Sequence, residues 1–147
     1  MLSSRPGLSE ALDVALIGFL TAVNESGQPQ SSPVWFIRDG DDLIVYNRPT
    51  APRLTSIASN PRVAFNLRGD RQGHAGVSLE GTAHLEEDLP PAYRFPGYVE
   101  KYSHEIAGLG WTPESFSADY SVGLRIKVTR VRAFGLGRLG GGGSQLT

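Results

Sequence analysis

The chain has 147 residues, a formal net charge of −1 and no cysteine. A chain of this length fits one domain whose core needs no disulfide or structural metal. The lack of cysteine excludes disulfides, Cys-ligated zinc, iron–sulfur clusters and thiol catalysis, and the near-neutral charge argues against nucleic-acid binding. No stretch of the sequence resembles a membrane span or a signal peptide, so we expect a cytoplasmic protein.

The first half of the chain alternates between helical and strand-like apolar spacing, separated by short polar turns. The spacing predicts a helix over residues 8–15 and strands over 19–23, 30–38 and 43–47, with turns at 24–27 and 39–41. A second helix is expected over 50–60, with Thr50 as its cap and Pro52 in its first turn. The pair Asn60-Pro61 should end this helix, because the residue before proline is disfavoured in helical geometry.

The second half predicts three more strands, over residues 62–68, 77–85 and 122–134, with a glycine-rich loop at 69–76. Between them, residues 90–110 are polar and aromatic and should be helical after Pro96, and another short helix should begin at Thr112-Pro113. The apolar alternation of the last strand changes phase at Val131, which indicates a bulge near Thr129-Arg130.

Six strands joined mostly by tight turns predict a mainly β protein with short helices, in which an antiparallel sheet closes into a barrel. We expect one domain over residues 1–139 and a flexible glycine-rich tail over 140–147.

Three common signatures of function have little support in this sequence. Residues 135–140 match the G-x-G-x-x-G fingerprint, but no acidic residue follows at the spacing that dinucleotide binding requires. The three histidines, at 74, 84 and 104, lack metal-ligand spacing, and no G-x-S-x-G elbow is present. We therefore expect neither a Rossmann site, nor a metal site, nor a serine hydrolase.

The most informative segment runs from Tyr46 to Leu54, where a strand ends and a helix begins close to Arg48 and Arg53. The N-terminus of a helix offers unpaired N–H groups and a partial positive charge, and a guanidinium adds a fork of donors. This combination suits a phosphate group. The alternative is that both arginines are ordinary solvated charges.

Five motifs occur in order along the chain, namely 33–36 (PVWF), 39–40 (DG), 47–54 (NRPTAPRL), 60–64 (NPRVA) and 79–83 (LEGTA). Together they resemble the pyridoxamine 5′-phosphate oxidase-like split β-barrel family, over about residues 15–135. In particular they resemble its actinobacterial deazaflavin (F-420)-dependent oxidoreductase branch, the FDOR-B type. The resemblance implies a six-stranded antiparallel split barrel that forms a homodimer, with a cofactor bound in a groove between the subunits.

The resemblance also implies which residues bind the cofactor. Arg53 matches the basic residue that holds the phosphate in the family, where lysine is more frequent, and the strand over 32–35 would lie along the cofactor ring. The implied cofactor-binding residues are Ser32, Pro33, Val34, Trp35, Asn47, Arg48, Pro49, Thr50, Arg53, Leu54, Arg62, Val63 and Ala64. The C-terminal residues lack the arginine–histidine stretch of true pyridoxamine phosphate oxidases, which argues against pyridoxal phosphate synthesis.

The function implied is hydride transfer from reduced F-420 to a small organic substrate, with chemistry carried by the cofactor rather than by catalytic side chains. Two alternatives stay open: an FMN-binding oxidase or electron-transfer protein, and a non-enzymatic binder of F-420 or a flavin. Tyr46, Tyr98 and Tyr102 are candidate proton donors, with aromatic packing as the other role for each. We expect residues 90–117 to shape the substrate pocket, where Trp111 lies either in the pocket or in a core or interface.

Overall fold

The computed structural model describes residues 1–139, so the predicted flexible tail over 140–147 lies outside the described residues. Its elements, in chain order, are α1 (Pro6–Val14), β1 (Gly18–Val23), β2 (Pro29–Val34), β3 (Ile37–Asp39), β4 (Asp42–Asn47), α2 (Pro52–Ser59), β5 (Arg62–Asn66), β6 (Gly76–Leu85), the 3-10 turn η1 (Ala92–Arg94), α3 (Tyr98–Gly108), α4 (Pro113–Asp119), β7 (Val122–Phe134) and α5 (Leu136–Leu139). The fold is mainly β with short helices, as the sequence predicted, and β7 has the predicted bounds.

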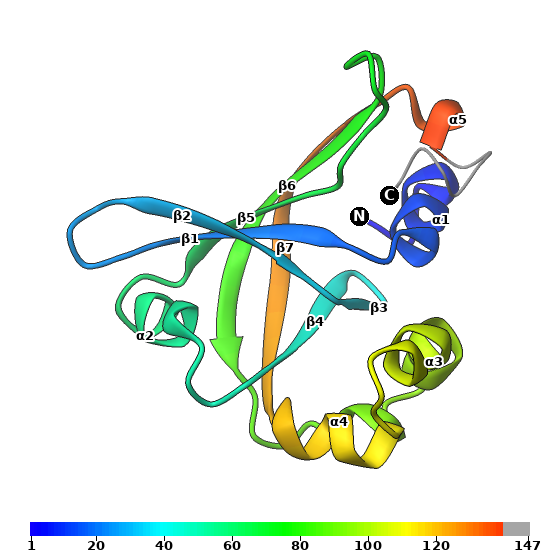
Figure 1. Ribbon diagram of the computed structural model, residues 1–147. Coiled ribbons are helices and arrows are strands. Elements are labelled where there is room, and N and C mark those ends of the chain that lie inside the picture. The colour runs from blue at the N-terminus through cyan, green and yellow to red at the C-terminus, as the bar shows by residue number, and fades with distance from the viewer. Residues whose placement is uncertain (140–147) are drawn as a thin grey trace.

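The strands form one antiparallel sheet in the order β2-β1-β5-β6-β7-β4-β3. The two edge strands, β2 and β3, follow each other in the chain and are separated only by Trp35 and Phe36. The sheet must therefore curl until its two edges meet at Trp35-Phe36, which we call the joint. The result is a split barrel that is open beside the joint (Figure 1).

One predicted strand, over 30–38, is wrong as a single element. The structure divides it into β2 and β3, so the sheet has seven strands instead of six. The reason lies at Phe36, whose backbone groups bond to side chains instead of to a neighbouring strand. Its N–H donates to the Tyr102 hydroxyl at 2.9 Å, and its carbonyl oxygen accepts from Lys101 Nζ at 3.0 Å.

Tyr102 and Lys101, both on α3, join the barrel joint to the N-terminal segment. The Tyr102 hydroxyl donates to the carbonyl oxygen of Leu16 at 2.6 Å, and Lys101 Nζ donates to the carbonyl oxygen of Leu12 at 3.2 Å. Tyr102 is fully buried, and Lys101 Nζ lies 3.9 Å from the centre of the Phe36 ring. We call Phe36, Lys101 and Tyr102 the seam.

The predicted bulge in the last strand is confirmed. Glu80 pairs with Arg130 and Gly81 pairs with Val128, so Thr129 is the extra residue on β7. Gly81 has no alternative at this position, because a Cβ there would lie 2.4 Å from the carbonyl oxygen of Lys127.

The start of α2 differs from the prediction. The residue at the cap is Ala51 rather than Thr50, and no side chain caps the helix. Pro52 occupies the first turn as expected, and the helix ends at Ser59, with Asn60 as its C-cap. Thr50 is exposed and lies one residue too early to accept from the first helical N–H groups.

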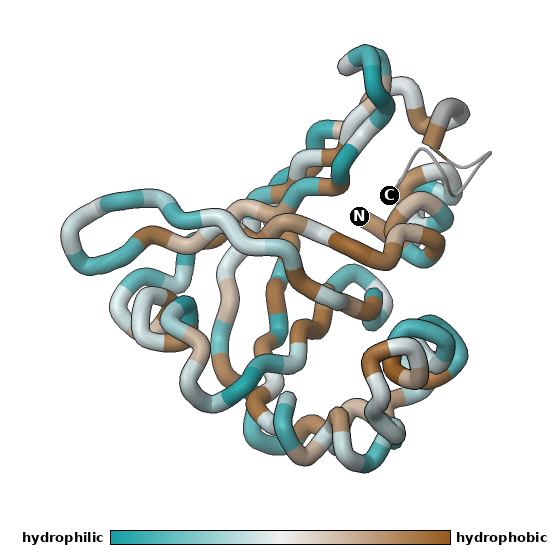
Figure 2. Tube along the Cα trace, in the orientation of Figure 1, coloured by the Kyte–Doolittle hydropathy of each residue, from teal (hydrophilic) through white to brown (hydrophobic). Residues whose placement is uncertain are grey.

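Two hydrophobic clusters lie on opposite sides of the curled sheet. One fills the barrel interior and includes Phe36, Phe65 and Leu12, and the other lies between β4 and the helices α3 and α4 and includes Tyr46, Tyr98 and Phe116. Figure 2 shows hydrophobic residues along β1, β3 and β4, whereas the tip of the β1–β2 hairpin is hydrophilic.

The residues of the G-x-G-x-x-G match have a packing role in the part of the chain that is described. α5 is only four residues long and lies against α1, where Leu139 is fully buried. Within residues 1–139, no helix is both long and apolar enough to span a membrane.

Removing the Tyr102 hydroxyl should weaken the seam. Tyr102→Phe keeps the ring but leaves the buried N–H of Phe36 without its partner, so we expect unfolding free energy to fall by about 1–3 kcal/mol. Chemical denaturation measures this change. Tyr93→Phe is the matched control, because the Tyr93 ring contacts Arg94 outside the seam, and equal stability of the two variants would contradict the role of Tyr102.

The seam should also make stability depend on pH. Burial lowers the pKa of Lys101 to about 8, partly offset by the nearby Asp13. Between this pH and the usual lysine pKa, the unfolded chain binds more protons than the folded chain, so stability should rise with pH across that window. Denaturation at several pH values below about 10, where tyrosines of the unfolded chain stay protonated, should show this rise in the wild type and not in Lys101→Met.

The exposed lysine of β7 supplies the control for this measurement. Lys127→Met should keep the rise of the wild type, since Lys127 lies on the solvent-facing side of the strand. Parallel pH profiles for Lys101→Met and the wild type would show that Lys101 does not titrate in this window.

Candidate functional site

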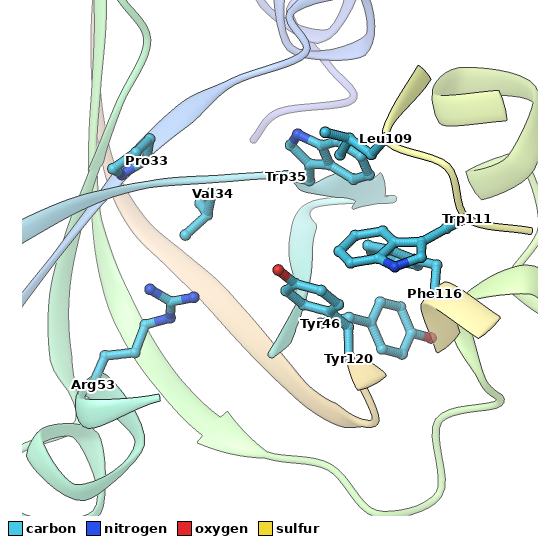
Figure 3. A pocket seen from close by; sticks show the side chains of 9 residues that line it. All are labelled: Pro33, Val34, Trp35, Tyr46, Arg53, Leu109, Trp111, Phe116 and Tyr120. Atoms are coloured by element: carbon cyan, nitrogen blue, oxygen red, sulfur yellow. The ribbon is translucent and has the colours of Figure 1, made fainter. Parts of the chain in front are cut away.

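A cavity of about 410 Å³ lies beside the joint, at the opening of the split barrel. Its lining comes from β2, from β4, from the first turn of α2 and from the segment that includes α4. The lining residues are Pro33, Val34, Trp35, Tyr46, Arg53, Leu109, Trp111, Phe116 and Tyr120. Figure 3 shows that Arg53, Pro33 and Val34 form one end of the cavity and that aromatic side chains form the other.

Arg53 is held in place by two neighbours. Its Nε donates to Asn47 Oδ1 at 2.6 Å, and its Nη1 donates to Ser32 Oγ at 3.0 Å. Asn47 is fully buried, and its amide nitrogen donates to the carbonyl oxygens of Val45 and Val122, both at 3.0 Å. These two bonds fix the amide orientation, so that its oxygen faces the guanidinium.

Arg53 carries a charge that no described residue neutralises. It is half-buried, yet no carboxylate within residues 1–139 lies at ion-pair distance from it. Burial lowers the pKa of Arg53, with a smaller opposing effect from Tyr120, but a guanidinium remains charged at neutral pH. A half-buried cation without a counter-ion is a site to which an anionic group can bind.

The start of α2 adds to this end of the cavity, since the helix begins at Pro52 without a capping side chain. Pro52 has no N–H, and the Leu54 N–H donates to the carbonyl oxygen of Ala51 at 3.1 Å, so the first turn offers a ligand the backbone N–H of Arg53 itself. Arg48 is arranged differently. It lies 4.0 Å from Asp119 and stacks over the Tyr120 ring, 5.0 Å from its centre, so it joins the β4–α2 loop to α4.

The other end of the cavity is a wall of packed rings. Trp35 stacks on Phe116 at 5.2 Å, and Phe116 stacks on Tyr120 at 4.6 Å between ring centres. Trp111 contacts both Phe116 and Tyr120. We call Trp35, Trp111, Phe116 and Tyr120 the aromatic wall.

Two of the three tyrosines considered as proton donors, Tyr46 and Tyr102, donate their hydroxyls to backbone carbonyl oxygens. Tyr98 and Tyr102 are buried outside the cavity, and burial raises the pKa of each. Tyr46 lines the cavity, but its hydroxyl donates to the carbonyl oxygen of Pro90 at 2.6 Å, and burial raises its pKa to about 12.

The structure brings together about half of the residues predicted from the sequence. Pro33, Val34, Trp35 and Arg53 line the cavity, Ser32 and Asn47 bond to Arg53, and Arg48 lies at the aromatic wall. The remaining residues lie outside the cavity lining: Pro49 and Thr50 are exposed in the loop, Leu54 and Val63 pack in the core, Arg62 is exposed on β5, and Ala64 pairs with Thr21 and Glu80.

The sequence did not single out Leu109, Phe116 or Tyr120 as lining residues. Leu109, Trp111 and Phe116 belong to the segment 90–117, which was expected to shape the substrate pocket, and all three line this cavity. Tyr120 falls just beyond that segment. The nearby Thr112-Pro113 start of α4 was the available signal, since it implied a short helix whose end returns the chain to β7.

A metal centre has no support in the described part of the chain, where no cluster of three potential ligands occurs. The cavity lining also contains no histidine and no carboxylate.

Solved structures with the same fold have varied names. A conserved hypothetical protein from Mycobacterium tuberculosis is 22% identical, with a TM-score of 0.73 over 92% of this chain and 87% of that chain. An F420 reductase is 21% identical, with a TM-score of 0.63 over 84% of this chain and 94% of that one. The heme storage protein HutZ from Vibrio cholerae is 15% identical, with a TM-score of 0.63 over 89% of this chain and 94% of that one.

No curated protein matches the sequence. The family model for pyridoxamine 5′-phosphate oxidase does match, over residues 6–135, which include the whole sheet and the cavity lining. The chain therefore belongs to the pyridoxamine 5′-phosphate oxidase family, with its split-barrel fold.

Proposed function

We propose that this protein is an F-420-dependent oxidoreductase, which reduces a small organic substrate with a hydride from the reduced deazaflavin coenzyme. The observation that supports it best is Arg53, a half-buried guanidinium without a carboxylate partner at the polar end of the cavity. The coenzyme carries a phosphate group, and its flat ring suits the apolar remainder of the lining.

In this proposal the chain contributes binding and orientation. Arg53 and the uncapped start of α2 hold the phosphate, and Asn47 and Ser32 keep the guanidinium aimed at it. Pro33 and Val34 of β2 border the ring, and the aromatic wall excludes water from the reacting face. A bound deazaflavin would supply the hydride, so no nucleophile or metal is needed from the protein.

FMN is the alternative cofactor. Flavins such as FMN are cofactors of this family. The phosphate site suits FMN and F-420 equally, because both carry a phosphate group. The F420 reductase among the proteins of like fold supports the deazaflavin, and so does the order of motifs along the chain.

We also propose that the protein is a homodimer with the cofactor between subunits. On this hypothesis the exposed residues Pro49, Thr50 and Arg62 lie along the groove that the partner completes. Sedimentation analysis in the presence and absence of cofactor measures the oligomeric state.

Replacing Arg53 tests the phosphate site directly. Arg53→Ala should weaken cofactor binding at least about tenfold, because hydrogen bonds to charged groups contribute about 1.5–3 kcal/mol. Arg53→Lys keeps the charge and should recover part of the affinity, because a lysine cannot keep both bonds to Asn47 and Ser32. Fluorescence titration of purified protein with F-420 and with FMN measures both effects.

Arg71→Ala is the matched control, because Arg71 is exposed in the β5–β6 loop and outside the cavity lining. If Arg53→Ala changes affinity by less than about twofold, the phosphate is held elsewhere.

The same titration separates the candidate functions. Tight F-420 binding with weak FMN binding supports the deazaflavin oxidoreductase. The reverse result would support an FMN-binding oxidase or electron-transfer protein instead. Binding of F-420 without turnover of any substrate by the reduced coenzyme would leave a non-enzymatic binder.

A further inference from the structure

A second cavity, of about 430 Å³, lies where the end of β6 and the loop after it meet the start of β7. Its volume is in the range of ligand pockets. It shares Tyr46 with the cavity beside the joint, and the Tyr46 hydroxyl donates to the carbonyl oxygen of Pro90, another residue of its lining. The second cavity is therefore a separate space with one common wall, and the proposed function gives it no role.

Most of the second lining is apolar. Leu85, Leu89 and Val122 contribute to it, together with two prolines of the β6–β7 connection. Leu89 rests on the backbone of β7, since a Cβ at Gly123 would lie 2.6 Å from Leu89 Cδ1. Leu85 is half exposed, so a ligand that covered it would remove apolar surface from water.

The charged side chains of this lining are carboxylates, those of Glu86 and Glu87. Glu86 Oε2 accepts from Arg125 Nε at 2.8 Å, but Arg125 also donates to Asp39 and Asp42, both at 3.0 Å. One guanidinium is thus shared by three carboxylates. In the described part of the chain, Glu87 forms no ion pair. The cavity therefore combines apolar surface with an excess of negative charge.

The lining also offers hydrogen-bond acceptors. Glu87 and Ser121 are exposed, and within residues 1–139 neither side chain has a hydrogen-bond partner. The hydroxyl of Ser117, by contrast, donates to the carbonyl oxygen of Pro113 and accepts from the Tyr93 N–H. An ammonium group has three donors and no acceptor, so it suits the free carboxylate and hydroxyl.

We propose that the second cavity binds a small organic amine in its protonated form. The ammonium group pairs with Glu87 and Glu86, and the apolar body of the ligand covers Leu85, Leu89 and Val122. An anionic ligand would lie beside carboxylates that Arg125 only partly neutralises, which disfavours it. This inference goes beyond the proposed function and does not depend on it.

Two probes of equal shape test the charge preference. 2-Phenylethylamine and 2-phenylethanol share a ring and a two-carbon chain, and they differ in carrying an ammonium or a hydroxyl group. Titration of the ¹⁵N-labelled full chain, followed by backbone amide chemical shifts, reports both the affinity and the location of each probe. The amine should shift the amides of residues 85–89 and 121–123, which belong to or flank the second lining.

We expect the wild type to bind the amine more tightly than the alcohol. Glu87→Gln should weaken amine binding about two- to fivefold, the effect of an exposed ion pair, and should leave alcohol binding unchanged. Glu86→Gln combined with Glu87→Gln should remove most of the preference for the amine. Leu85→Ser should weaken both probes, because it removes apolar contact surface.

Asp88→Asn is the matched control. Asp88 is exposed in the same loop and outside the lining, so its removal changes the net charge equally and should leave amine binding unchanged. Equal losses in Asp88→Asn and Glu87→Gln would reduce the effect to general charge attraction and overturn the site.

Equal affinity of the wild type for the amine and the alcohol would overturn the role of the carboxylates. Lack of amine binding, or shifts confined to the cavity beside the joint, would overturn the second cavity as the amine site. Each of these results leaves the proposed function untouched, because the cofactor titrations with Arg53→Ala are measured without these probes.

Discussion

The structure depends on how the chain closes the sheet at Phe36. Here the chain passes from one edge of the sheet to the other, where no neighbouring strand can bond to its backbone. A buried N–H or C=O without a partner is costly, so closure requires donors and acceptors from another element. α3 provides both through Tyr102 and Lys101. The helix is therefore part of the barrel's closure as well as a cover for its surface.

The same joint determines the geometry of the site. Phe36 packs in the barrel interior, while its neighbour Trp35 packs with the second cluster, stacked on Tyr102 at 4.7 Å. Trp35 and Phe36 are adjacent and face opposite clusters. The bonds that fix the backbone at Phe36 therefore also fix the position of the Trp35 ring in the aromatic wall. The cavity thus has a rigid border where the barrel is open.

Regular features were predictable from the sequence, because they depend on local patterns. The phase change at Val131 predicted the bulge, and Thr112-Pro113 predicted the start of α4. The break at Trp35-Phe36 was not predictable, since the partner of Phe36 N–H lies 66 residues away and is a side chain. Tyr120 was missed for a similar reason. Its place in the cavity lining depends on contacts with Phe116 of α4 and with Arg48, which only the folded chain creates.

The two ends of the cavity both offer hydrogen-bond donors, but of different kinds. At one end Arg53 is half-buried without a carboxylate, although an acidic residue in place of Asn47 or Ser32 would compensate its charge. Neutral partners orient the guanidinium and leave its charge available for a ligand. At the other end the donors are uncharged and sit among rings. Such a cavity suits a ligand that has an anionic group at one end and a flat body at the other.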